Sequence, residues 1–282
     1  MSVKNLIIAV LIINFLSINK GFAGKGQADG DNNKEVSASI AATTDYIWRG
    51  FSLTTNKPAL HGEFTLMIPK SPIKGLYFDL WFSNVRFFAD EPLSDNSPEI
   101  EESGNSEETS ENEAPKPKRE PIFMQEDGSH RAFMEFDTSI GISNEINKNA
   151  SYDIWFVRYL YPGATNLDYN ELSGEFKFFF LTSDIGLTNN VYNTGGKALY
   201  CNFGYDFAVP ESLLKFKQVR LRGGIGHYFL PEISGSNSYT DYNLQIQKTY
   251  KKFAFNLLWT KTNDKISPFG GSKVSFEVTA YL

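Results

Sequence analysis

Cysteine and histidine are scarce in this sequence of 282 residues, and their scarcity excludes several kinds of site. Cys201 is the single cysteine, so neither an internal disulfide nor a cysteine-rich zinc site can form. The three histidines, His61, His130 and His227, lie far apart and show no spacing typical of metal ligands. We therefore expect no metal and no cofactor.

An excess of positive charge is also lacking. Lys and Arg total 27 against 33 Asp and Glu, which gives a net charge of −6 at pH 7. A protein that binds nucleic acid normally carries a basic patch or stripe. The charge balance therefore argues against a nucleic-acid partner.

Long apolar runs are absent except near the N-terminus. Residues 6–16 are 11 apolar or near-apolar positions that follow Lys4, and residues 21–23 (GFA) form a small-x-small end. This layout is typical of a secretory signal peptide, and the run is about half of the ~20 residues that a membrane helix needs. We predict a signal peptide over 1–23, an exported chain and no transmembrane helix.

Aromatic residues, in contrast, are abundant, with 24 Phe, 14 Tyr and 4 Trp. After a polar, glycine-rich leader over 24–35, they recur in short segments where apolar and polar residues alternate, as in 76–83 and 274–282. Alternation with period 2 predicts strands with two unlike faces. The twelve predicted strands are 36–47, 58–68, 76–87, 131–144, 150–161, 169–180, 183–189, 197–209, 217–230, 239–250, 253–262 and 272–282.

The lengths of the connections alternate. The odd-numbered connections, counted along the chain, are longer on the whole than the even-numbered ones. Bacterial outer-membrane barrels have long extracellular loops and short periplasmic turns, whereas a soluble sandwich has no reason to keep this parity. The parity favours a membrane barrel.

One odd-numbered connection contains an acidic insert. Residues 90–113 hold ten acidic and no basic residues, and a short basic patch follows at 116–119. Such a segment cannot bury enough apolar surface to fold, so we predict a disordered extracellular loop over about 90–121. A cation-binding or pore-mouth role for this loop stays open.

The alternation alone does not decide whether the apolar face packs inward, as in a soluble β-sandwich, or faces lipid. Aromatic residues near strand ends, charges in the middle of the polar faces and a last strand that ends at Leu282 favour the barrel. Arg158 is an exception to the alternation, because it falls on the apolar face of its predicted strand. Either a β-bulge shifts the register there or the side chain extends to the membrane interface.

In a barrel the polar face lines the lumen, and its charges would set the selectivity of a channel. Eight acidic and three basic positions in this set favour cations weakly. The candidate lumen charges are Asp79, Glu135, Asp137, Glu171, Glu175, Lys177, Asp206, Arg220, Arg222, Asp241 and Glu277.

Two blocks of sequence resemble a known family. Residues 44–52 (TDYIWRGFS) with 58–62 (PALHG), and later 161–164 (YPGA), are similar to landmarks of the TorF family, also called the Gcw_chp family. The resemblance implies an outer-membrane β-barrel provisionally called a porin, without a catalytic motif. The matching positions are Asp45, Tyr46, Arg49, Gly50, Ser52, Pro58, Gly62, Tyr161, Pro162 and Gly163.

The first block allows two interpretations. Gly50 and Gly62 suit tight backbone positions near a barrel rim, and Asp45 and Arg49 are candidates for an ion pair at the mouth. Alternatively, and as the interpretation we favour, the block only shapes a turn and fixes strand register.

We predict a single antiparallel barrel of about twelve strands over 36–282, in the outer membrane of a Gram-negative bacterium. It would pass small polar solutes or ions by diffusion, with a weak cation preference and no enzymatic activity. Its partners would be outer-membrane lipid and, during insertion, the barrel-assembly machinery; the oligomeric state stays open. The alternatives are a closed barrel with a structural or surface-interaction role, a lipid hydrolase that uses His227, and a soluble secreted β-protein.

Overall fold

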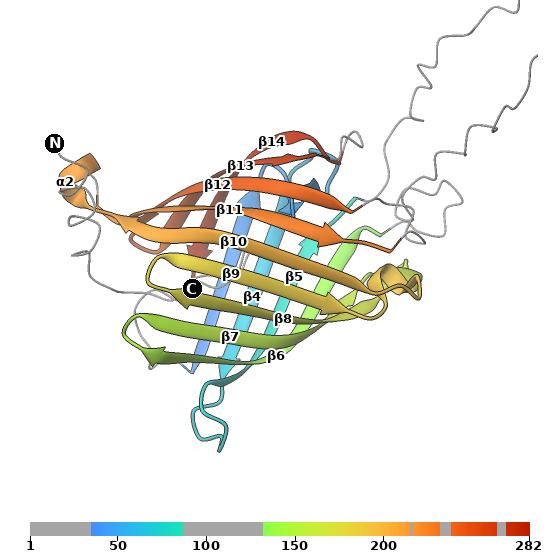
Figure 1. Cartoon of the computed structure of the whole chain (residues 1–282), viewed down its shortest axis with the longest axis horizontal. Coiled ribbons are helices and arrows are strands. Elements are labelled where there is room, and N and C mark those ends of the chain that lie inside the picture. The colour runs from blue at the N-terminus through green and yellow to red at the C-terminus, as the bar shows by residue number, and fades with distance from the viewer. Residues whose placement is uncertain (1–34, 87–131, 215–216, 232–237, 264–268) are drawn as a thin grey trace, which may run out of the picture.

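Twelve antiparallel strands close into one barrel in the computed structural model of the chain, shown in Figure 1. The structure describes residues 35–86, 132–214, 217–231, 238–263 and 269–282. The barrel strands are β1 (Val36–Thr43), β4 (Ala59–Met67), β5 (Leu76–Asn84), β6 (Met134–Asn147), β7 (Ala150–Leu160), β8 (Tyr169–Phe178), β9 (Leu181–Thr188), β10 (Ala198–Val209), β11 (Val219–Phe229), β12 (Tyr239–Tyr250), β13 (Phe253–Thr262) and β14 (Ser272–Tyr281).

Each strand pairs with its neighbours along the chain, and β1 closes the ring by pairing with both β4 and β14. The missing numbers belong to a two-stranded hairpin, β2 (Ile47–Trp48) and β3 (Phe51–Ser52), in the connection from β1 to β4. Three short helices lie in other connections: η2 (Thr165–Leu167), η3 (Val191–Asn193) and α2 (Glu211–Leu214). The predicted all-β antiparallel barrel is confirmed.

The predicted strands match the observed ones to within two residues, except in three strands. The first was expected over 36–47 but ends at Thr43, because the chain then turns away from the wall into the hairpin. The third was expected over 76–87 but β5 ends at Asn84. The fourth was expected over 131–144 but β6 extends to Asn147, where an irregularity in its pairing with β7 lies between Glu145 and Asn147.

The two faces of the barrel wall have opposite character. Large apolar side chains point outward, as in Ile140 (51 % exposed) and Phe203 (71 % exposed), whereas Asp79 and Glu171 point inward and are each 1 % exposed. A soluble sandwich buries its apolar face, but this single closed sheet presents that face to its surroundings. The distribution fits a barrel wall immersed in lipid and excludes the β-sandwich.

The barrel has a loop end and a turn end. Two-residue turns at 148–149, 179–180 and 251–252 join strands at the turn end, where α2 also lies. The hairpin β2–β3, η2 and η3 lie at the loop end. The predicted signal peptide, the leader up to residue 34 and the acidic insert lie outside the described residues. In the part of the chain that the structure describes, no helix is long and apolar enough to cross a membrane.

Arg158 points outward, as its place in the alternation requires. Its pairing with Asn170 belongs to a continuous register, so no bulge shifts it. It lies near the loop end of β7, is 40 % exposed and forms an ion pair with Asp168 at 3.4 Å. Of the two explanations, extension to the interface is the one that the geometry supports.

Candidate functional site: a charged lumen under an inward hairpin

The hairpin β2–β3 folds into the loop end of the barrel instead of extending beyond it. Its two-residue turn is Arg49-Gly50, with φ values of 48° and 82°. Positive φ at both central residues is the requirement of a type I′ turn, the tight turn that matches the twist of paired strands. Trp48 and Phe51 flank this turn and are paired as strand partners, and both side chains are buried.

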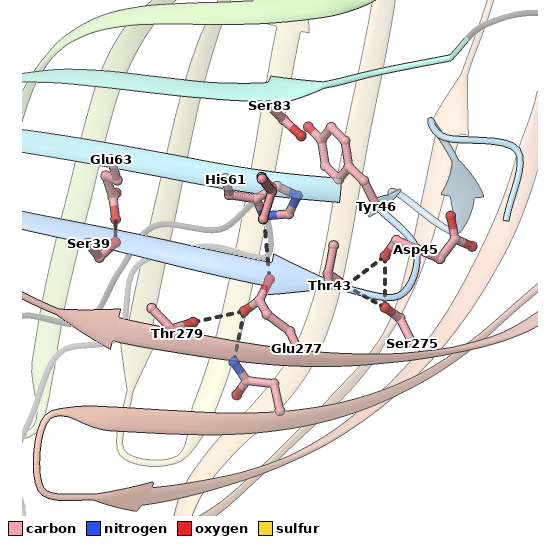
Figure 2. A network of polar contacts seen from close by, with 12 residues as sticks. Ser39, Thr43, Asp45, Tyr46, His61, Glu63, Ser83, Ser275, Glu277 and Thr279 are labelled. Carbon is pink, nitrogen blue, oxygen red and sulfur yellow. Dashed lines mark hydrogen bonds and ion pairs between the residues drawn. The ribbon is translucent and has the colours of Figure 1, made fainter. Parts of the chain in front are cut away.

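Asp45 anchors the base of the hairpin. Its Oδ1 accepts hydrogen bonds from the hydroxyls of Ser52 at 2.5 Å and Thr54 at 2.9 Å. Its backbone oxygen accepts a hydrogen bond from Ser275 on β14 at 2.7 Å, as Figure 2 shows. Burial raises the pKa of the Asp45 carboxyl, although the two hydroxyls and Lys273 act in the opposite direction.

Arg49, at the tip, crosses the lumen to the far wall. Its guanidinium makes a two-pronged ion pair with Glu171 on β8, at 2.6 and 2.9 Å. The same group lies 4.4 Å from the ring centre of Tyr200 and 4.8 Å from that of Tyr228. Asp45 and Arg49, considered as an ion pair from the sequence, therefore have different partners.

Gly50 allows the tip to touch the barrel wall at β12 and β13. A Cβ atom at this position would lie 2.6 Å from Thr262 Cγ2 and 2.8 Å from Asp241 Cβ. Next to it, the Tyr239 hydroxyl donates a hydrogen bond to the backbone oxygen of Arg49 at 3.0 Å. The tip of the hairpin is therefore packed against β12 and β13, in addition to its ion pair with β8.

Aromatic side chains fill the loop end around the hairpin. Trp48 packs edge-on against Tyr159 and Tyr228, and Phe51 packs against Tyr239. The buried cluster also contains Tyr46, Tyr161, Leu167, Tyr169, Val191 and Phe269. A layer of packed rings thus covers the lumen where the long loops begin.

The second sequence block reaches the same place from another strand. Tyr161 is buried and its hydroxyl donates a hydrogen bond to Glu135 at 3.0 Å. Pro162 and Gly163 are exposed in the turn that leads to η2, where Gly163 has a φ of 87°. The two blocks are far apart in the sequence, and the structure brings them together at one end of the barrel.

Pro58 and Gly62 have local structural roles. Pro58 is exposed immediately before β4. Gly62 lies in β4 with regular pairing on both sides, so there is no bulge, and the ring of Phe82 occupies the place of its missing side chain. Ser52, the remaining position of the first block, holds Asp45 and also accepts a hydrogen bond from the Asn56 amide at 2.9 Å.

The eleven candidate lumen charges all lie on inward positions of their strands. Further inward charges, which were not among the eleven candidates although the same alternation places them on that face, are His61, Glu63, Asp153, Asp184 and Lys273. Arg49 of the first sequence block also faces the lumen, from the turn of the hairpin.

Lysine and arginine side chains are concentrated on one side of the lumen, whereas carboxylates lie on both sides. The inner face of β4 to β7 carries Glu63, Asp79, Glu135, Asp137 and Asp153 and, within the described residues, no Lys or Arg. The cations gather on β8 to β11 around one carboxylate. Asp206 lies 2.7 Å from Arg220, 3.3 Å from Lys177 and 3.7 Å from Arg222.

A second small network joins β1, β4, β13 and β14 (Figure 2). Glu277 lies 3.4 Å from His61 and accepts hydrogen bonds from Asn256 at 2.9 Å and Thr279 at 3.2 Å. The rings of Tyr46 and Trp81 flank His61, with ring centres 5.0 and 5.2 Å away. Through Tyr46 this network touches the base of the hairpin.

A cavity of about 100 Å³ lies in the lumen against the hairpin. One water needs roughly 10–15 Å³ measured in this way, so the cavity has room for several waters or a small solute. Its lining includes residues 47–50 of the hairpin, Asp79, Trp81 and Asp137 on one side, and Asn243 and Thr260 on the other. Within the described residues, no three His, Cys, Asp or Glu side chains are arranged to hold a metal.

The geometry does not favour the hydrolase alternative. His227 lies on the outer face of β11, where its Nδ1 is 2.9 Å from the Thr240 hydroxyl and its ring packs against Phe229. Ser234, the first serine after His227 in the sequence, lies outside the described residues. Cys201 is half-buried on the outer face of β10.

The sequence profile described as "Bacterial protein of unknown function (Gcw_chp)" matches residues 27–280. The chain belongs to the Gcw_chp family. The match does not carry the name TorF, which stays a resemblance. Among curated proteins none matches this member of the family.

Several solved barrels resemble this Gcw_chp protein in outline. The structure described as "KdgM porin" has 7 % identity and a TM-score of 0.43, and covers 87 % of this chain and 98 % of its own. A "NanC porin" has 4 % identity and a TM-score of 0.47, and covers 87 % and 99 %. A mutant Rh. blastica porin has 12 % identity and a TM-score of 0.35, and covers 79 % and 55 %. These likenesses are distant.

Proposed function

We propose that this Gcw_chp protein is a porin-like channel of a bacterial outer membrane through which small polar solutes or ions diffuse passively. The observation that carries the proposal is the inverted polarity of a closed barrel. Large apolar side chains face outward, while carboxylates such as Asp79 and Glu171 and the cation Arg222 are buried inside. A lumen lined with charged side chains is typical of barrels through which water or a polar solute passes.

The inward charges support a weak preference for cations. The inward charged positions on β4 to β7 are mainly acidic. Among the described residues, no lysine or arginine lies on this part of the inner face. A permeating cation would meet attraction along this wall, whereas an anion would be attracted chiefly to the side of Arg220, Arg222 and Lys177.

The hairpin sets the width of the proposed path at the loop end. In the described conformation, Arg49 holds the tip against Glu171, and rings fill the space around it. We propose that this contact restricts conduction to small solutes and that its release widens the path. The predicted signal peptide supports export, and the apolar outer wall supports contact with membrane lipid.

Current across a planar bilayer under a salt gradient tests the proposal. The detergent-purified mature protein is expected to give discrete current steps, with a reversal potential that indicates a modest preference for cations. An anion preference would contradict the proposed role of the carboxylates. A folded, heat-modifiable barrel that never conducts, even with residues 47–52 replaced by a short linker, would contradict the channel itself.

A closed barrel with a structural role is the second candidate, and the hairpin is the observation that favours it. Arg49, Gly50 and Trp48 close the loop end by contacts with six different strands, β7, β8 and β10 to β13. In this case the deletion of the hairpin would produce no current. The experiment above therefore separates the two candidates.

A further inference from the structure

The cavity next to the hairpin is lined by far more negative than positive groups. Its lining carboxylates are Asp79, Asp137, Glu171, Asp184 and Asp241, and its single cation is Arg49. Glu171 engages Arg49 through both of its oxygens. The remaining charge in the cavity wall is therefore negative and would attract a cation.

Several buried acceptor atoms in this lining have no hydrogen-bond partner among the described residues. They include Asp79 Oδ2, Asn243 Oδ1 and Thr260 Oγ1, in side chains that are 1 %, 7 % and 2 % exposed. The other oxygen of Asp79 accepts a hydrogen bond from Thr65 at 2.6 Å. Buried polar atoms are rarely left without a partner, so these atoms point to a donor-bearing occupant of the cavity.

Aromatic faces complete the wall beside Asp79. Trp81 pairs across strands with Asp137, and Asp79 with Ser139, so an indole and two carboxylates occupy adjacent inward positions of β5 and β6. Trp155 and Tyr159 continue the wall on β7. Aromatic faces attract cations, most strongly where water is excluded.

We propose that this cavity binds a small primary ammonium ion. Such an ion has three N–H donors, which fit the acceptors without partners, and a positive charge, which fits the carboxylates. A quaternary ammonium ion would satisfy the aromatic faces but not the acceptors. The inference deepens the channel proposal and rests on it only for the route by which the ion enters.

Calorimetric titration of the detergent-purified full-length mature protein with propylammonium chloride tests the site. Saturable binding is expected, with at least tenfold weaker binding of 1-propanol, which has the same shape without the charge. Tetramethylammonium should also bind at least tenfold more weakly. Equal binding of all three, or no binding of propylammonium, would overturn the proposal.

Variants locate the binding. Asp79→Asn keeps the shape of the side chain and is expected to weaken propylammonium binding about tenfold. Asp153→Asn is the matched control, because Asp153 is also a buried carboxylate on the inner wall but does not line the cavity. An equal loss in both variants, or no loss in Asp79→Asn, would show that the cation binds elsewhere and overturn the assignment.

The quenching of tryptophan fluorescence provides a second readout that does not depend on the Asp79 variant. Propylammonium should change the emission of the wild-type protein, and Trp81→Phe should reduce that change while preserving binding within a few-fold; Trp48 and Trp155, which also line the cavity, account for the remainder. An unchanged response in Trp81→Phe would place the ion away from Trp81 and contradict its position beside Asp79. Binding without bilayer current would contradict the channel and leave the site standing, whereas current without binding would overturn the site alone.

Discussion

At the scale of single residues, Arg49 combines an unfavourable backbone with favourable contacts. Its positive φ of 48° costs a residue with a side chain about 1–2 kcal/mol. The ion pair with Glu171 and the rings of Trp48 and Tyr200 offset this cost and tie the tip of the hairpin to the wall. Side-chain contacts thus hold a turn that the backbone alone would disfavour.

Removal of this contact should open the loop end. Arg49→Ala leaves Glu171 buried without its cation, and the loss of one partner of a buried pair costs about 3–5 kcal/mol. We expect a larger single-channel current than in the wild-type protein, measured in planar bilayers. Lys57→Ala is the control, because Lys57 is an exposed cation of the same connection. An unchanged current in Arg49→Ala would contradict a restricting role for the hairpin.

Asp45 should make the stability of the protein depend on pH. Because burial raises its pKa above the value in the unfolded chain, the folded state binds the proton more tightly. Its contribution is therefore fully present below about pH 4, the unfolded pKa, and is lost as the pH rises through the folded pKa.

The variant Asp45→Asn has no titrating side chain at this position, so it serves as the reference for the pH dependence of the wild-type protein. The free energy of unfolding of Asp45→Asn, measured in urea relative to the wild-type protein, should rise as the pH increases from 4 to 6. A difference between the two proteins that stays constant over this range would contradict the raised pKa.

At the scale of elements, the hairpin β2–β3 is an insertion that the barrel wall does not need. The Leu53 amide donates a hydrogen bond to the Tyr46 oxygen at 2.7 Å, so the chain enters and leaves the hairpin at the same point. The strands β1 and β4 pair with each other directly across eight residue pairs. Wall and hairpin are therefore separable parts of the structure.

Replacement of residues 47–52 by a Gly-Ser linker should leave the barrel folded, because Tyr46 and Leu53 are already adjacent. Its shift in electrophoretic mobility on heating should match that of the wild-type protein. The current should exceed that of Arg49→Ala, since the aromatic layer loses Trp48 and Phe51 as well as the ion pair. A smaller current than in Arg49→Ala would indicate that the barrel wall, and not the hairpin, limits conduction.

At the scale of the whole molecule, the barrel is polar inside and apolar outside, so its surroundings must be apolar for the fold to be stable. The outward positions lie at different depths along the wall. Ile140 is far from both ends of β6, whereas Arg158 is near the loop end of β7. The position of a charge along the strand therefore decides its cost.

Ile140→Arg should destabilise the barrel in lipid vesicles by about 2–4 kcal/mol, as expected for an arginine at the bilayer midplane. Ile140→Leu, which keeps the apolar surface, should change the free energy of unfolding by less than about 1.5 kcal/mol. Arg158→Leu should also have a small effect, because Arg158 is near the interface. Equal costs for Ile140→Arg and Ile140→Leu would contradict a lipid-facing wall.

The sequence by itself determined the twelve strands, their two faces and the inward position of the charges, because alternation with period 2 is a local property of each segment. The resemblance of residues 44–52 to a family landmark agrees with the family match, yet the sequence favoured only a turn there.

Only the tertiary structure decided what that segment does. The partner of Arg49 is 122 residues away in the sequence, and the walls that meet at the cavity belong to strands from opposite halves of the chain. Closure of the sheet between β1 and β14 creates these contacts, and no local pattern encodes which inward side chains then face one another across the lumen.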